Sequence, residues 1–125
     1  LEFVHRGAAD DRGLVVSVFV QAGQKNAAFE AVLRALPKQP GGSSSPSGVA
    51  FDPAAWLPAE HAYIDYMGSM TTPPCTEGVR WCVLRSAIEA SQDQIDRYLR
   101  DPRLAGSARP EMPANARLVR MGATP

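Results

Sequence analysis

The sequence has few cysteines, few histidines and no excess charge of either sign. Its 125 residues include 2 cysteines and 2 histidines, and its 13 basic side chains balance 13 acidic ones. A balanced charge offers no electrostatic attraction to nucleic acid or to an anionic membrane surface. We therefore expect no nucleic-acid partner, whereas small or neutral ligands stay open.

Long apolar runs are also missing. No stretch approaches the ~18 apolar residues that cross a bilayer, so we predict no membrane span. No export signal is visible, and the chain begins at Leu1 inside a strand-like segment, which we interpret as a cut within a longer domain. The residues that are present, 45% hydrophobic and 21% charged, indicate one globular domain.

Two strand patterns lie near the beginning of the chain. Residues 2–6 form a short strand pattern, in which alternation places Glu2 and Val4 on one face. Residues 14–21 are rich in β-branched side chains and predict one buried strand, with Val16 on its apolar face. The short turn-forming connection between the two segments favours an antiparallel pair.

Helical spacing of apolar residues follows these strands. Asn26 is placed to cap a helix that runs to about Leu36. The glycine, serine and proline residues of 37–48 indicate a connecting loop. Residues 51–67 contain prolines and are predicted to be irregular.

A second helix is predicted closer to the C-terminus. Ser91 and Gln94 form a capping box for a helix that ends at Arg100, and we expect Ile95 and Leu99 on its buried side. The chain beyond this helix has the composition of a loop. Strands with short peripheral helices predict an α+β, mainly β fold built on an antiparallel sheet.

Two adjacent threonines, Thr71 and Thr72, stand ahead of a Pro-Pro pair. A residue before proline is kept out of the helical conformation, and each proline fixes φ and lacks a backbone donor. We therefore expect the threonine hydroxyls in a rigid loop. Residues 78–85 then have the pattern of a strand, in which Val79 and Trp81 share a face.

The longer string at residues 69–81, Ser-Met-Thr-Thr-Pro-Pro-Cys-Thr-Glu-Gly-Val-Arg-Trp, resembles the Ser-Leu-Thr-Thr-Pro-Pro segment of the alpha-class carbonic anhydrases, with its following Glu, Val and Trp. Residues 1–5 are similar to that family's Leu-His-Leu-Val-His strand, and residues 14–20 to the apolar strand after it. Residues 51–66 resemble the approach to the Thr-Thr-Pro-Pro loop. Asn-Ala-Arg at 115–117 resembles the family's Asn-x-Arg-Pro, and we expect no match beyond it.

This resemblance implies that residues 1–125 are the C-terminal portion of a single alpha carbonic anhydrase domain. The implied fold is part of a large twisted, mostly antiparallel central sheet with short peripheral helices. The implied reaction is the zinc-dependent, reversible hydration of carbon dioxide to bicarbonate. In exported bacterial members a cysteine at the place of Cys75 pairs with one in the N-terminal half, so the implied compartment is the periplasm or the cell exterior.

The resemblance also implies a zinc site held by three histidines. Two of these would lie in the N-terminal half of the domain, and Glu2 stands where the third is expected. Three interpretations of Glu2 stay open: a carboxylate ligand to zinc, the match to a glutamate that the family places behind its ligands, or an unpaired strand residue. We therefore expect this chain to be inactive alone.

Thr71 is the catalytic residue that the resemblance implies, because its hydroxyl would orient the zinc-bound hydroxide. Thr72 would contact bicarbonate or water beside it. A small apolar pocket suits carbon dioxide, which has no charge and offers few hydrogen bonds. The residues assigned to that pocket are Val4, Val16, Met70, Val79 and Trp81.

The remaining chemistry-bearing residues are assigned structural roles. We expect His5 to be a core histidine on the face opposite the metal, and His61 to be exposed. Cys82 is expected to be a small buried hydrophobe. A second hypothesis from a different class is a catalytically silent carbonic-anhydrase-like binding or structural module; Glu2 favours it, whereas the intact Thr71 favours an enzyme.

Overall fold

The computed structural model describes residues 1–8, 13–37, 39, 42–44, 52–102, 104 and 109–123. The chain divides into two compact units. The first comprises Leu1–Phe19, Leu57–Ile88 and Met112–Pro125, and the second comprises Val20–Trp56 and Glu89–Glu111. Strands outnumber helices in the described chain, which confirms the predicted α+β, mainly β fold class.

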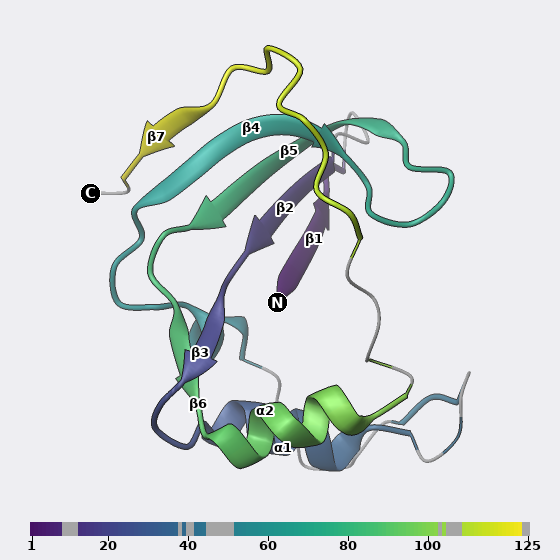
Figure 1. Ribbon diagram of the computed structural model, residues 1–125, viewed down its shortest axis with the longest axis vertical. Coiled ribbons are helices and arrows are strands. Elements are labelled where there is room, and N and C mark those ends of the chain that lie inside the picture. Colours follow the sequence, from purple (N-terminus) through teal and green to yellow (C-terminus); the bar gives the residue numbers. More distant parts are fainter. Residues whose placement is uncertain are drawn as a thin grey trace. The chain divides into compact units, whose positions relative to one another are not determined.

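The first unit is a five-stranded sheet with the strand order β1-β2-β5-β4-β7 (Figure 1). The strands are β1 Glu2–Arg6, β2 Gly13–Ser17, β4 Tyr63–Ser69, β5 Glu77–Leu84 and β7 Arg120–Gly122. β1 and β2 are antiparallel, as predicted, and so are β4 with β5 and β4 with β7. β2 and β5 run parallel, so the sheet is mixed.

The prediction of one strand over 14–21 is wrong. β2 ends at Ser17, and a separate strand, β3 (Val20–Ala22), belongs to a different sheet. Between them the backbone changes its hydrogen-bonding partner: Val18 N–H donates to the Leu1 carbonyl at 2.9 Å, whereas the Phe19 carbonyl accepts from Ile88 N–H at 2.9 Å. The β-branched run is continuous in sequence, but its two parts pair with strands of different sheets.

Two further segments contain more regular structure than predicted. Residues 51–67 were expected to be irregular, yet they contain a 3₁₀ helix, Pro53–Trp56, and most of β4. The chain after the second helix was expected to be loop, yet β7 pairs with β4 at Tyr63–Asp65. Both strands depend on pairing with distant segments, which local composition does not record.

The second unit contains both helices. β3 pairs with β6 (Ile88–Ala90). α1 (Ala27–Ala35) begins after the predicted cap, where the Asn26 side chain accepts a hydrogen bond from Phe29 N–H. α2 (Gln92–Arg100) begins with the predicted capping box of Ser91 and Gln94.

The prediction of an apolar buried side for α2 is only partly right. Ile95 is half-buried, but Leu99 is 58% exposed. The side chain of this helix that is fully buried is Gln94. Its side-chain amide bonds to the backbone of Asn26, the cap of α1, so a polar group lies in the contact between α1 and α2.

Candidate active-site loop and apolar cluster

The segment between β4 and β5 is a closed loop. Met70 N–H donates to the Thr76 carbonyl at 2.9 Å, and Cys75 N–H donates to the Thr72 carbonyl at 2.9 Å. Thr71 and Thr72 are both exposed. The two backbone bonds hold the loop in one shape, which agrees with the predicted hydroxyl-bearing turn.

The start of this loop is attached to β5 through Trp81. The indole Nε1–H of Trp81 donates to the Ser69 carbonyl at 3.0 Å. Gly68 makes this approach possible, since a Cβ there would lie 3.0 Å from Cδ1 of Trp81 and 3.3 Å from Cε2 of Tyr66. Any larger residue would therefore press on two aromatic rings beside the loop.

A buried apolar cluster adjoins the loop. Val15, Val79 and Trp81 are 1%, 5% and 7% exposed, and the partly buried side chains of Tyr66 and Met70 pack against them. The predicted association of Met70, Val79 and Trp81 is present as a packing arrangement. Their role in holding carbon dioxide stays a prediction.

The strand register corrects one member of the predicted pocket. Val15 lies opposite Trp81 in the parallel pair of β2 and β5, and Val4 lies opposite Val15 in the pair of β1 and β2. Directly opposed residues point to the same face, so Val4, Val15 and Trp81 share one face. Val16 lies opposite Cys82 on the other face, and its predicted place in the cluster is wrong.

The error at Val16 has a simple cause. Val15 and Val16 are both apolar and β-branched, so alternation alone does not select which of them faces the cluster. A shift of one residue along a strand moves every side chain to the opposite face. Val4 is on the cluster's face but is 51% exposed.

Glu2 lies on the same face of the sheet as Val4 and the cluster. It is opposite Ser17 in the register of β1 and β2, and it is exposed. Within the described residues there is no group of three or more His, Cys, Asp or Glu side chains that could hold a metal ion. The described part of the chain therefore does not assemble a three-ligand zinc site by itself.

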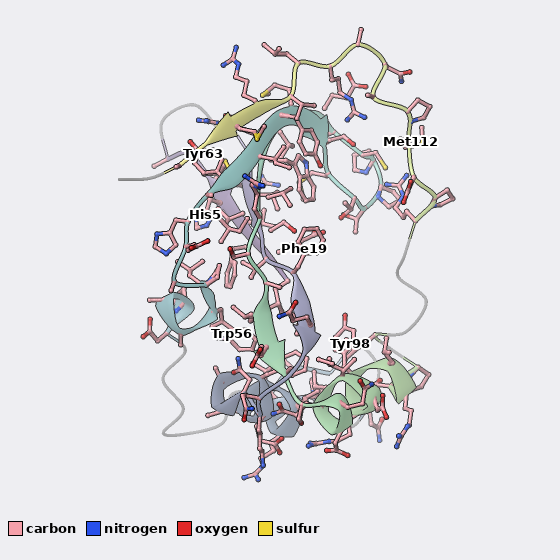
Figure 2. All side chains as sticks on the ribbon, turned by 60° about the vertical axis from the view of Figure 1, so that its left-hand side comes forward. His5, Phe19, Trp56, Tyr63, Tyr98 and Met112 are labelled. Carbon is pink, nitrogen blue, oxygen red and sulfur yellow. The ribbon has the colours of Figure 1, made fainter. Side chains whose placement is uncertain are left out.

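The two histidines are both exposed. His61 agrees with its prediction, whereas the predicted burial of His5 is wrong. β1 is the outermost strand of the described sheet, so the side chains on the face of His5 have fewer neighbours. Figure 2 labels His5 among the side chains of the described residues.

The opposite face of the sheet carries an ion pair and a cysteine. Asp65 accepts hydrogen bonds from Arg80, and this ion pair raises the pKa of Arg80. Burial raises the pKa of the Cys82 thiol, although the side chain is only half-buried. A raised pKa keeps the thiol protonated and unreactive, which fits the structural role predicted for Cys82.

Sequence reasoning missed an aromatic stack beside the cluster. Tyr66 stacks on Trp81 with 6.3 Å between ring centroids and 7° between planes. The guanidinium carbon Cζ of Arg117 lies over the same Tyr66 ring, 5.7 Å from its centroid. The Asn-Ala-Arg motif at 115–117 was visible in the sequence, but nothing local connected it to β4.

A family model for eukaryotic-type carbonic anhydrases matches residues 3–122. The chain belongs to the alpha-class, or eukaryotic-type, carbonic anhydrases. The match continues beyond 115–117, so the expectation that it ends there is wrong. Within the family, the chain is 39% identical over 119 residues to a carbonic anhydrase of Nostoc sp., covering 95% of this chain and 44% of the relative.

Other carbonic anhydrases agree with this assignment. The chain is 35% identical over 119 residues to a carbonic anhydrase of Neisseria gonorrhoeae, covering 94% of this chain and 45% of the relative. The solved structure of the alpha-carbonic anhydrase of Thermovibrio ammonificans with sulfanilamide matches with a TM-score of 0.84 and 37% identity, over 94% of this chain and 51% of that one. A carbonic anhydrase of Chlamydomonas reinhardtii with acetazolamide matches with a TM-score of 0.85 and 30% identity, over 96% and 55%.

The chain thus spans about half the length of the carbonic anhydrases that it matches. The similarity of the structures confirms the alpha carbonic anhydrase fold. Among the described residues, no helix is long and apolar enough to cross a membrane.

Proposed function

We propose that this chain supports the reversible hydration of carbon dioxide to bicarbonate, the zinc-dependent reaction general to its family. The observation that carries the proposal is the closed Thr71–Thr72 loop beside the buried cluster of Val15, Val79 and Trp81. A hydroxyl held next to an apolar surface combines the two requirements of this reaction, which are orientation of an oxygen nucleophile and a dry place for an uncharged substrate.

Thr71 has the central role in this proposal. Its hydroxyl accepts a hydrogen bond from the attacking oxygen and so directs a lone pair toward the carbon of the substrate. Orientation of this kind lowers the barrier because the reacting atoms are held in a near-attack geometry. Thr72, next along the exposed loop, contacts bicarbonate or water as the product forms.

The apolar residues hold carbon dioxide. We place Val15 in this surface instead of Val16, together with Val4, because the register puts both on the face of Trp81. Met70 and Val79 complete it through their packing on the same cluster.

Zinc is the cofactor general to the family, and when bound it supplies a hydroxide nucleophile at neutral pH. A catalytic zinc takes three protein ligands. Because the described residues offer Glu2 on the cluster's face and no group of three ligands, they do not fit the metal by themselves. We propose that the other two ligands come from a segment of the complete protein that corresponds to the part of the relatives that this chain does not span.

The first test is Thr71→Ala in the complete protein. We expect turnover to fall by ~100-fold, the usual loss for one oriented hydrogen-bonding group in a transition state. Thr76→Ala is the matched control, because Thr76 is exposed in the same loop and uses its backbone carbonyl to hold Met70. Turnover is measured by stopped-flow hydration of carbon dioxide; equal rates for Thr71→Ala and the parent would remove the role of Thr71.

Two facts favour a second function from a different class. Glu2 occupies the position expected of a histidine ligand, and the described residues form no three-ligand group. A carbonic-anhydrase-like module without catalysis, which binds a partner or serves structurally, is consistent with both facts. The periplasm or cell exterior stays our predicted compartment for either function.

A further inference from the structure

We propose that Arg117 is a positioning residue for the Thr71 loop, acting through the rings of Tyr66 and Trp81. The inference deepens the proposed function, since it matters for catalysis only if Thr71 orients the nucleophile. It concerns a contact between the C-terminal segment and β4 that lies outside the loop itself. Four observations, taken from Arg117 toward Thr71, carry it.

The guanidinium of Arg117 is anchored by its own turn. Its Nε donates to the Ala114 carbonyl at 2.9 Å, and its Nη2 donates to the Pro113 carbonyl at 2.8 Å. Asn115 and Ala116 have positive φ values of 48° and 58°, a conformation that folds the chain back so that these carbonyls face the side chain. Both donors point along the plane of the group, which leaves its flat face for another contact.

That flat face meets Tyr66. The Arg117 carbon Cζ lies 5.7 Å from the ring centroid, within the range of a cation–π interaction. Arg117 itself is exposed, whereas the Tyr66 ring that it covers is half-buried and packs against the cluster. A planar, anchored guanidinium restricts the tilt of the ring more than a flexible ammonium would.

The Tyr66 ring transmits this restraint to Trp81. The two rings are nearly parallel, 7° apart in plane and 6.3 Å between centroids. Trp81 is 7% exposed and is packed against Val15 and Val79, so it has little freedom to compensate for a displaced neighbour.

Trp81 in turn holds the residues directly before Thr71. Its indole N–H donates to the Ser69 carbonyl at 3.0 Å, and Met70 packs on the same cluster. A tilt of the indole would move the Ser69 carbonyl and with it the backbone that leads to Thr71. Small displacements of a positioned group lower reaction rates strongly, so the arginine affects the hydroxyl without touching it.

The experiment uses NMR on the complete protein with uniform ¹⁵N labelling. The probes are the indole N–H of Trp81 and the backbone amides of Met70 and Thr71. Arg117→Gln removes the charge over Tyr66 but keeps one amide donor. Arg117→Lys keeps the charge and loses the planar pair of donors. Arg120→Gln is the matched control. Arg120 lines the same hollow of about 430 Å³ as Arg117, and its substitution by glutamine removes the same positive charge.

In Arg117→Gln we expect all three resonances to shift. We expect the indole N–H to exchange with solvent about tenfold faster, because the variant loses a cation–π contact and one charged hydrogen bond. Arg117→Lys should lie between Arg117→Gln and the parent. Arg120→Gln and the amides in the centre of β2 should match the parent. This pattern would support a local positioning role, since general loosening would accelerate exchange in β2 as well.

The inference is overturned by parent-like exchange in Arg117→Gln, by equal changes in Arg120→Gln, or by equal acceleration in β2. If Arg117→Gln does not fold, Arg117→Lys decides alone, and an exchange rate equal to that of the parent overturns the inference. None of these probes requires turnover or metal. A failure of the proposed carbonic anhydrase function is therefore distinguishable from a failure of the positioning role.

Discussion

At the scale of single residues, Trp81 has two functions that depend on different atoms. Its ring fills the cluster with Val15 and Val79, and its indole N–H holds the Ser69 carbonyl. The spacing of Val79 and Trp81 in the sequence predicts a shared face. It does not predict a hydrogen-bond partner, because the carbonyl belongs to the preceding strand and its distance depends on the register of β4 and β5.

Gly68→Ala tests how tightly this region is packed. The added methyl group would lie 3.0 Å from Trp81 and 3.3 Å from Tyr66, and both rings are held by their stack. We expect a loss of about 1–3 kcal/mol in the free energy of unfolding, the usual cost of overpacking. Urea denaturation measures it, with Met67→Ala as control, since Met67 is the exposed neighbour of Gly68 in β4. Equal stability of Gly68→Ala and the parent would contradict this close packing.

At the scale of elements, α1 and α2 are joined by a buried amide. The Gln94 carbonyl oxygen accepts from Asn26 N–H at 2.9 Å and from Ser91 N–H at 3.1 Å, and the Gln94 amide donates to the Asn26 carbonyl at 2.7 Å. Sequence analysis identified both helix caps, because a cap depends on residues within one turn. It did not foresee that the capping residue of α2 also holds the cap of α1.

Gln94→Ala should therefore destabilise the packing of both helices. The backbone donors of Asn26 and Ser91 would lose their acceptor in a buried site, and we expect a loss of about 2–4 kcal/mol in the free energy of unfolding. Gln92→Ala is the matched control from the same helix, because Gln92 is exposed and bonds to Asp96 within the helix. Thermal unfolding followed by circular dichroism compares them; a similar small loss in both variants would contradict the linking role of Gln94.

The same pair of helices is also joined by an ion pair that responds to pH. Glu30 of α1 accepts hydrogen bonds from Arg97 of α2 and from Arg34, and these lower its pKa to about 2 from an ordinary value of 4.5. A depressed pKa in the folded state means that the ionised carboxylate stabilises the fold. This stabilisation is present above about pH 4.5 and is lost as the pH falls through about 2.

We expect Glu30→Gln to lower the urea midpoint at pH 6 and to have a progressively smaller effect between pH 4.5 and pH 2, where the parent itself becomes protonated. The measurement is a series of urea titrations across this range. Asp93→Asn is the control, since Asp93 is well exposed and lies 3.9 Å from Arg97. If the urea midpoints of Glu30→Gln and the parent differ by the same amount at every pH, the charge of Glu30 is not the cause of the difference.

At the scale of the whole molecule, the chain has the fold of the family over about half of the family's length. Glu2 lies on the face of the apolar cluster. The described residues contain no group of three or more side chains that could hold a metal ion. A three-ligand zinc site therefore requires side chains beyond those that the described residues supply.

Glu2→His in the complete protein separates the two proposed functions. If the glutamate has weakened a zinc site, histidine should increase zinc affinity, because a neutral imidazole is the ligand that catalytic zinc sites of this kind use. Competitive titration against a zinc-sensitive dye measures the affinity, and Glu77→His, at the exposed start of β5, is the control. An unaltered zinc affinity would show that Glu2 is not what weakens zinc binding, and it would favour the module without catalysis.

The sequence by itself determined the features that depend on neighbouring residues. These are the caps at Asn26 and Ser91, the shared face of Val79 and Trp81, and the threonine loop whose long string also identified the family. Local rules suffice there, because a cap or a proline acts on residues within one turn of itself.

Only the tertiary structure decided which segments meet. It selected Val15 over Val16 for the cluster, divided residues 14–21 between two sheets, and placed Arg117 over Tyr66. Each of these depends on the register or the approach of a strand that is distant in sequence. A local pattern leaves such choices open, because several faces and partners satisfy it equally until long-range packing selects one.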